Sequence, residues 1–111
     1  MAGDLPPDRI LGMELTPALA GRLLKRIAAD SGRVFFTVHA NAQMRKRHIT
    51  PQQVLTCLRH GRIIEGPARS PKGNWEFAVE AVAAGELIHV PAAFDEDAHG
   101  TLIIVISAYF K

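Results

Sequence analysis

The chain has 111 residues, of which 48% are hydrophobic and 22% are charged, so it has the length and composition of one globular domain with a modest core. Its one cysteine, Cys57, excludes an intrachain disulfide and a zinc site of paired cysteines, and favours a reducing compartment. The formal net charge of +2 conceals an asymmetry, because residues 22–72 hold eleven Lys and Arg against two acids, whereas residues 73–111 hold one Lys against six acids. Such a basic half suggests a polyanion or an acidic protein as partner, and it equally suits amphipathic helices with basic outer faces.

The N-terminal residues lack the cationic and apolar pattern of a signal peptide, and no apolar stretch approaches the length of a membrane span. We therefore expect a cytoplasmic protein without membrane contact. Residues 1–14 show no hydrophobic period and contain Pro6, Pro7 and Gly12. We expect them to form a flexible arm ahead of a single domain over residues 15–111.

Helix signals dominate the first half of the predicted domain. Thr16 and Thr50 each precede a proline and can cap the free amides of a first helical turn, and Gln53 completes a capping box with Thr50. In chain order we expect a helix that begins at Pro17 and ends near Gly32, a strand over 33–38, a short helix over 40–47 and a helix from Pro51 to Gly61.

Strand signals dominate the second half. Apolar and polar residues alternate over residues 75–82, and the final run over residues 102–110 is apolar on both parities, as in an inner strand. We expect strands over 62–65, 75–82, 87–94 and 102–110, with a loop over 66–73 and an acidic turn over 95–100. This order predicts an α+β fold with the N-terminal helices packed on one face of a mostly antiparallel sheet of four to five strands.

The hairpin between the second and third of these strands predicts a specific register. If Ala84 and Gly85 form a two-residue turn, Val79 faces Val90 on the apolar side, and Glu80 faces His89 on the other side with Cβ atoms about 5 Å apart. A carboxylate beside an imidazole can act as an acid–base pair in RNA cleavage without metal. Pairs of this kind also occur as ordinary surface contacts, and both interpretations stay open.

His39 is a second candidate for catalysis because it lies at the predicted strand-to-helix junction, where a capping or surface role is the alternative. It shares one helix face with an amide and a guanidinium at i, i+4 spacing. No cluster has metal-ligand spacing and no glycine-rich phosphate loop is present, so we expect neither a metal nor a cofactor. The candidate substrate-binding residues are Gln43, Arg45, Arg47, Arg69, Lys72 and Tyr109.

Residues 33–109 resemble an uncharacterised bacterial domain family with an HAxxRMxxRGI box, a capped helix, a GxIxE strand, a KGNW segment and a hairpin. Two positions depart from the box, because Gln43 replaces its first arginine and His48 replaces its glycine. The matching residues are His39, Ala40, Met44, Arg47, Ile49, Gly61, Ile63, Glu65 and Lys72 to Trp75.

The order of elements is also similar to that of RelE-like and motility quorum-sensing regulator toxins, which have a RelE/barnase-like fold and cleave mRNA. This resemblance implies a toxin of a type II toxin–antitoxin system that cleaves mRNA without metal, with or without the ribosome, and is silenced by an antitoxin protein. His39, Glu80 and His89 would then be its catalytic residues. The alternative is a non-catalytic module of the same fold that binds nucleic acid or protein, which Gln43 and the exposed acids favour.

Overall fold

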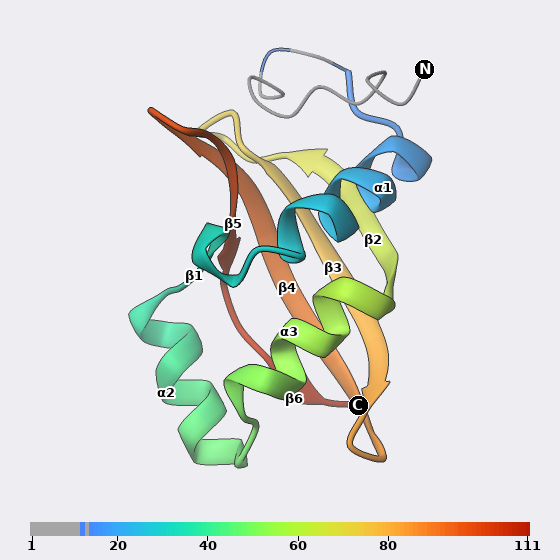
Figure 1. Cartoon of the computed structure of the whole chain (residues 1–111), viewed down its shortest axis with the longest axis vertical. Coiled ribbons are helices and arrows are strands. Elements are labelled where there is room, and N and C mark those ends of the chain that lie inside the picture. The colour runs from blue at the N-terminus through green and yellow to red at the C-terminus, as the bar shows by residue number, and fades with distance from the viewer. Residues whose placement is uncertain (1–11, 13) are drawn as a thin grey trace.

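Figure 1 shows the computed structural model of the chain, which describes residues 12 and 14–111. The predicted arm over residues 1–14 therefore lies almost wholly outside the described residues. The helices are α1 (Pro17–Ala28), the 3-10 helix η2 (Ser31–Arg33), α2 (Val38–Arg47) and α3 (Pro51–His60). The strands are β1 (Val34–Phe36), β2 (Arg62–Arg69), β3 (Trp75–Ala83), β4 (Glu86–Asp97), β5 (Gly100–Val105) and β6 (Tyr109–Phe110).

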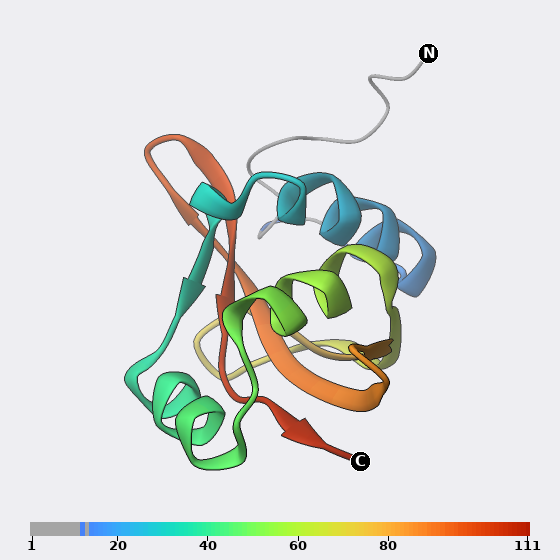
Figure 2. The same ribbon diagram turned by 60° about the horizontal axis from the view of Figure 1, so that its bottom comes forward.

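The described strands form one open sheet in the order β1-β5-β4-β3-β2, with β6 beside β4. All pairs are antiparallel except β1 with β5. Helices α1 and α3 cover one face of the sheet, and α2 packs at its end against β1 and β6 (Figures 1 and 2). The predicted α+β fold is thus confirmed, with six strands in place of four to five.

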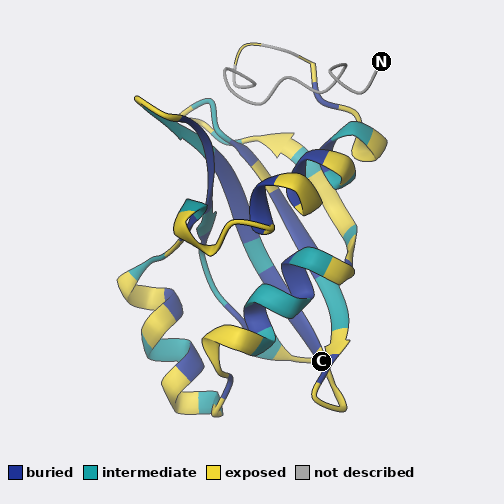
Figure 3. Ribbon diagram, viewed as in Figure 1, coloured by how far each residue is buried: buried dark blue, intermediate teal, exposed yellow. Residues whose placement is uncertain are grey.

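The core lies between the sheet and helices α1 and α3, where the facing strand residues are buried (Figure 3). Cys57 on α3 is fully buried among them, and this burial raises the pKa of its thiol to about 12. The fully buried large side chains include Leu23, Leu24, Val54, Leu58, Val79, Ile88, Val90, Phe94, Ile103 and Val105. The sheet face opposite the helices, which we call the open face, carries the alternate residues of the same strands.

Both predicted threonine caps are present. Thr16 Oγ1 accepts a hydrogen bond from the backbone N–H of Leu19 at 3.2 Å, and Thr50 forms the full capping box with Gln53. The predicted end of the first helix is wrong by a few residues, because α1 ends at Ala28. Asp30 then caps η2 through a 2.9 Å hydrogen bond from the N–H of Gly32.

The predicted strand-to-helix junction is also shifted. Thr37 Oγ1 accepts a hydrogen bond from the N–H of Ala40 at 2.9 Å, so Thr37 is the cap and α2 begins at Val38. The strand therefore ends at Phe36, and His39 lies inside the first turn of the helix. The mixed strand and helix propensities of residues 33–38 hid the threonine cap.

The first half of the predicted loop over residues 66–73 is strand, and residues 70–73 are the loop. Gly66 and Pro67 suggested a loop, but β2 passes through both as an edge strand and continues to Arg69. Around these two residues the pairing of β2 with β3 shifts in register, between Ile63 and Ala68. A bulged edge strand is where a β-sheet tolerates glycine and proline.

The last predicted strand is broken in two. After β5, the N–H groups of Ile106 and Ser107 both donate to the carbonyl of Pro91, at 2.9 and 3.3 Å. The chain then returns to β4 as β6. The predicted acidic turn is shorter than expected, because β4 extends to Asp97.

Candidate functional site

The β3–β4 hairpin has the predicted register, which places Glu80 directly opposite His89. Its turn residues Ala84 (φ 55°) and Gly85 (φ 82°) both have the positive φ that a type I′ turn requires. His89 Nδ1 lies 2.9 Å from Glu80 Oε2. Because an ionised carboxylate can only accept, Nδ1 carries the hydrogen and donates it.

Strand β6 covers this pair. Tyr109 pairs with His89 in the β4–β6 ladder, and the two ring centroids are 4.7 Å apart. Lys111 Nζ donates to Glu80 Oε2 at 3.0 Å. The His89 side chain is consequently only 4% exposed and that of Glu80 17%, whereas that of Lys111 is 46% exposed.

Helix α2 adds Arg47, the last residue of the helix. Its Nη1 donates to the carbonyl of Ala108 at 3.3 Å, and the guanidinium lies 5.7 Å from the centre of the Tyr109 ring, within cation–π range. Three separate parts of the chain therefore meet at one end of the open face. We call this group the Glu80–His89 cluster, which consists of Arg47, Glu80, His89, Tyr109 and Lys111.

The charges of the cluster are coupled. The hydrogen bond from His89, and after it the one from Lys111, lowers the pKa of Glu80 below its usual value. The hydrogen bond to Glu80 in turn raises the pKa of Lys111. At neutral pH the cluster thus holds an ionised carboxylate, two cations, an imidazole and a phenol, the groups that proton transfer beside a phosphate requires.

Other sequence-predicted residues lie along α2. His39 is exposed in the first turn, and its imidazole has no hydrogen-bond partner among the described residues. Gln43 lies between His39 and Arg47 on the same side of the helix, and eight residues of rise separate His39 from Arg47 by about 12 Å. Arg45 is exposed on the other side of α2. His39 and Gln43 therefore lie on the same side of α2 as Arg47, but they are not part of the cluster.

Arg69 and Lys72 lie at the far end of β3. Arg69 donates to the carbonyl of Gly73 at 2.9 Å, and its guanidinium lies 4.3 Å from the centre of the Trp75 ring. Lys72 lines a hollow at the same end of the sheet. Five residues of strand separate Trp75 from Glu80, which is about 17 Å. The structure does not bring Arg69 or Lys72 to the cluster.

Several cations of the basic half have structural partners. Lys25 on α1 donates to the carbonyl of Gly61 at 2.7 Å, and Arg59 on α3 donates to the carbonyl of Ala28 at 2.7 Å. Each helix thus satisfies the C-terminal carbonyls of the other. Arg33 forms a bidentate pair with Asp97 at 2.9 and 3.0 Å. These residues stabilise the fold, so the net charge of the segment overstates the cations that a ligand can meet.

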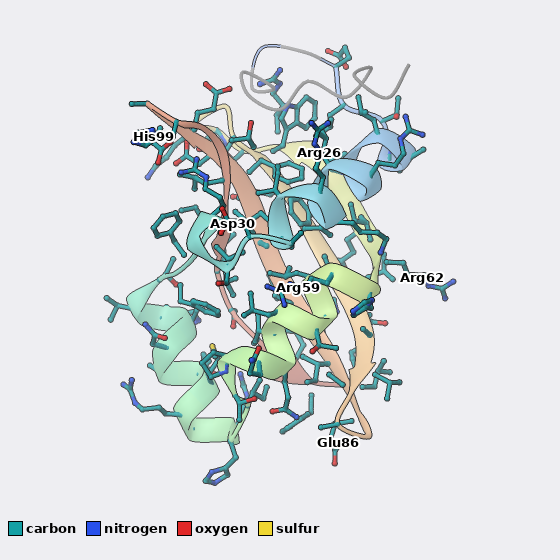
Figure 4. All side chains as sticks on the ribbon, in the orientation of Figure 1. Arg26, Asp30, Arg59, Arg62, Glu86 and His99 are labelled. Atoms are coloured by element: carbon teal, nitrogen blue, oxygen red, sulfur yellow. The ribbon has the colours of Figure 1, made fainter. Side chains whose placement is uncertain are left out.

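Two cations, Lys111 in the cluster and Arg62 next to it, were absent from the sequence-predicted set. Lys111 follows Tyr109 by two residues and therefore lies on the same side of the chain, a signal that the sequence contains. Arg62 lies opposite Glu80 in the β2–β3 ladder, and its side chain projects away from the ribbon (Figure 4). The pairing of Arg62 with Glu80 could not be predicted from the sequence, because β2 is bulged and its register with β3 is irregular.

The described residues contain no group of three His, Cys, Asp or Glu side chains close enough to hold a metal ion. None of the described helices is both long and apolar enough to cross a bilayer.

Residues 36–110 match the family model described as Domain of unknown function (DUF4258). The chain belongs to the DUF4258 family. The matched range includes four of the five residues of the Glu80–His89 cluster, together with α2 and α3, whereas Lys111 and α1 lie outside it. No curated protein matches the chain.

Proposed function

We propose that this DUF4258 protein is a metal-independent endoribonuclease and that the Glu80–His89 cluster is its reaction centre. One observation carries the proposal: Glu80 Oε2 lies 2.9 Å from His89 Nδ1 and 3.0 Å from Lys111 Nζ. The phenol of Tyr109 and the guanidinium of Arg47 complete the group.

The reaction requires two proton transfers and charge stabilisation. The ionised Glu80 takes the proton of a ribose 2′-hydroxyl, whose oxygen attacks the adjacent phosphorus as the bond to the 5′-oxygen breaks. His89, with both ring nitrogens protonated and Nδ1–H held by Glu80, donates its Nε2 proton to that leaving oxygen, so the products are a 2′,3′-cyclic phosphate and a 5′-hydroxyl. Lys111 and Arg47 stabilise the negative charge that develops on the phosphate oxygens.

RNA would approach from the end of the sheet where the cations lie. Arg62 lies opposite Glu80, Lys111 pairs with Glu80, and Arg47 lies over the Tyr109 ring. His39 and Gln43 extend this surface along α2, where they would contact a nucleotide next to the cleaved bond. Tyr109 has to shift from the His89 ring for the imidazole to reach the leaving oxygen, and the short β6 gives it few hydrogen bonds to break.

The biological role we propose is that of a RelE-like toxin that acts on mRNA and is silenced by an antitoxin protein. The α+β architecture and the small size support this role by analogy of fold. Induction of the chain in a bacterial host should arrest growth. His89→Ala and Glu80→Gln should each abolish the arrest, and His99→Ala, at the β4–β5 turn, should retain it.

Immunoblots of the soluble fraction would establish equal expression of the variants. Undiminished growth with soluble wild-type protein would contradict the toxin role. Arrest by the His89→Ala variant would contradict the assignment of the cluster as the reaction centre.

The second candidate is a non-catalytic module that binds RNA or protein, and the 3% exposure of His89 favours it. The replacement of the box arginine by Gln43 favours it as well. This module would retain RNA in a gel in a salt-dependent manner and release no cleavage products. Turnover of the RNA would exclude it.

A further inference from the structure

The open face contains a groove that begins at Ala78 and Pro91, two residues along their strands from Glu80 and His89, and extends away from the Glu80–His89 cluster. Two adjoining hollows of about 400 and 250 Å³ share Glu76 and Ile106 as lining residues. Their apolar floor comes from β3, β4, β5 and the segment after β5, and the loop between β2 and β3 borders one end. We call this the sheet groove, and its floor residues are Ala78, Pro91, Ala93, Ile104 and Ile106.

The charged residues of the sheet groove are mostly acidic. Glu65 and Glu76 line it and form no salt bridge with any described residue, although Glu65 also interacts electrostatically with Lys111. Among the described residues, Asp95 accepts a hydrogen bond from the backbone N–H of Glu96. Lys72 is the one cation among the lining residues. Three carboxylates against one ammonium repel phosphate and attract Lys or Arg side chains.

The apolar surface continues beyond the groove. Phe35 on β1 lies beside Ile104 in the parallel ladder and is 45% exposed. An exposed aromatic ring next to an apolar groove with a charged border is typical of protein–protein interfaces. The two ends of the open face thus differ in charge, with cations around the cluster and carboxylates around the groove.

We propose that the sheet groove binds a segment of a partner protein that presents apolar side chains flanked by Lys or Arg. The apolar side chains fill the two hollows, and the basic side chains pair with Glu65, Glu76 and Asp95. This assignment is independent of ribonuclease activity, because it uses no residue of the Glu80–His89 cluster.

The test uses the full chain labelled with ¹³C on its alanine and isoleucine methyl groups. The probe is a 12-residue peptide with four leucines and four arginines among serines and glycines. Three controls accompany it: the same peptide with serine for leucine, the same peptide with glutamate for arginine, and a 12-nucleotide oligouridylate.

The leucine–arginine peptide should shift the methyl signals of Ala78, Ala93, Ile104 and Ile106 in a saturable manner, and both control peptides should fail to do so. Glu76→Lys should raise the apparent Kd about fivefold, because an attraction becomes a repulsion. Glu86→Lys makes the same charge change at the β3–β4 turn, about 23 Å away along the strand, and should leave the Kd unchanged.

Three results would overturn the proposal. They are the absence of saturable shifts up to millimolar peptide, equal binding by the wild type and the Glu76→Lys variant, and shifts of the same methyl groups by oligouridylate. The last result would assign the groove to nucleic acid.

Discussion

At the scale of single residues, His48 occupies a conformation that its side chain disfavours. It is the cap residue at the end of α2, with φ 59° and ψ 38° in the left-handed region. The resemblance in the sequence predicts glycine at this position, and a left-handed cap would suit glycine because glycine has no Cβ to clash. The backbone thus accounts for the motif without a role in catalysis.

His48→Gly should therefore stabilise the protein, by about 1 kcal/mol, because the left-handed conformation costs a non-glycine residue roughly that much. Urea unfolding of both proteins would measure the change. His60→Gly, at the last residue of α3, is the matched control and should destabilise, because glycine in a right-handed helix costs backbone entropy. A loss of stability in the His48→Gly variant would show that the imidazole makes a compensating contact.

Asp97 should make the stability of the fold sensitive to acid. The bidentate hydrogen bonds from Arg33, and after them the N–H of His99, lower the pKa of Asp97 from 3.8 to about 2. This stabilisation is complete above the pKa of the unfolded chain and is lost as the pH falls towards 2.

The unfolding free energies of the wild type and Asp97→Asn should accordingly differ at pH 6 and converge by pH 2. Glu86→Gln removes a carboxyl that has no ion pair among the described residues, and its profile should follow that of the wild type. A constant difference between wild type and Asp97→Asn from pH 6 to pH 2 would contradict the ion pair.

At the scale of elements, α1 and α3 hold each other through their C-termini. Arg59→Met keeps much of the side-chain length and removes the 2.7 Å hydrogen bond to the carbonyl of Ala28. The carbonyl loses its charged partner, and we expect a cost of about 1–2 kcal/mol in unfolding free energy.

Chemical denaturation would measure this cost. Arg62→Met is the matched control, because the side chain of Arg62 projects into solvent whereas that of Arg59 lies between the helices (Figure 4). Equal stability of the two variants would show that the reciprocal contact contributes little.

The hairpin explains why part of the site was predictable. A two-residue turn fixes every pair of its ladder, so Ala84 and Gly85 were enough to place Glu80 beside His89. The return of β6 was not predictable, because Ser107 is the one turn-favouring residue in the apolar run over residues 102–110, at the point where Pro91 accepts two N–H groups, and a single serine is a weak signal for a break. Tyr109 and Lys111 therefore joined the cluster through a long-range contact that no local pattern encodes.

At the scale of the whole molecule, the open face is divided by charge. The helices cover the opposite face, so a large ligand meets either the cations around the Glu80–His89 cluster or the carboxylates of the sheet groove. Composition indicated a basic half, but Lys25, Arg33 and Arg59 are committed to structural contacts. Their partners are distant in sequence, so only the structure distinguishes the cations that stabilise the fold from those that a ligand can contact.

The central claim is that the Glu80–His89 cluster cleaves RNA without metal. The most direct test incubates the purified protein with a 5′-labelled RNA in excess EDTA and determines the end groups of the products. We predict fragments that end in a 2′,3′-cyclic phosphate, formed by the wild type and by His99→Asn, and lost in His89→Asn and Glu80→Gln. Intact RNA with folded wild-type protein, or equal cleavage by His89→Asn, would contradict the claim.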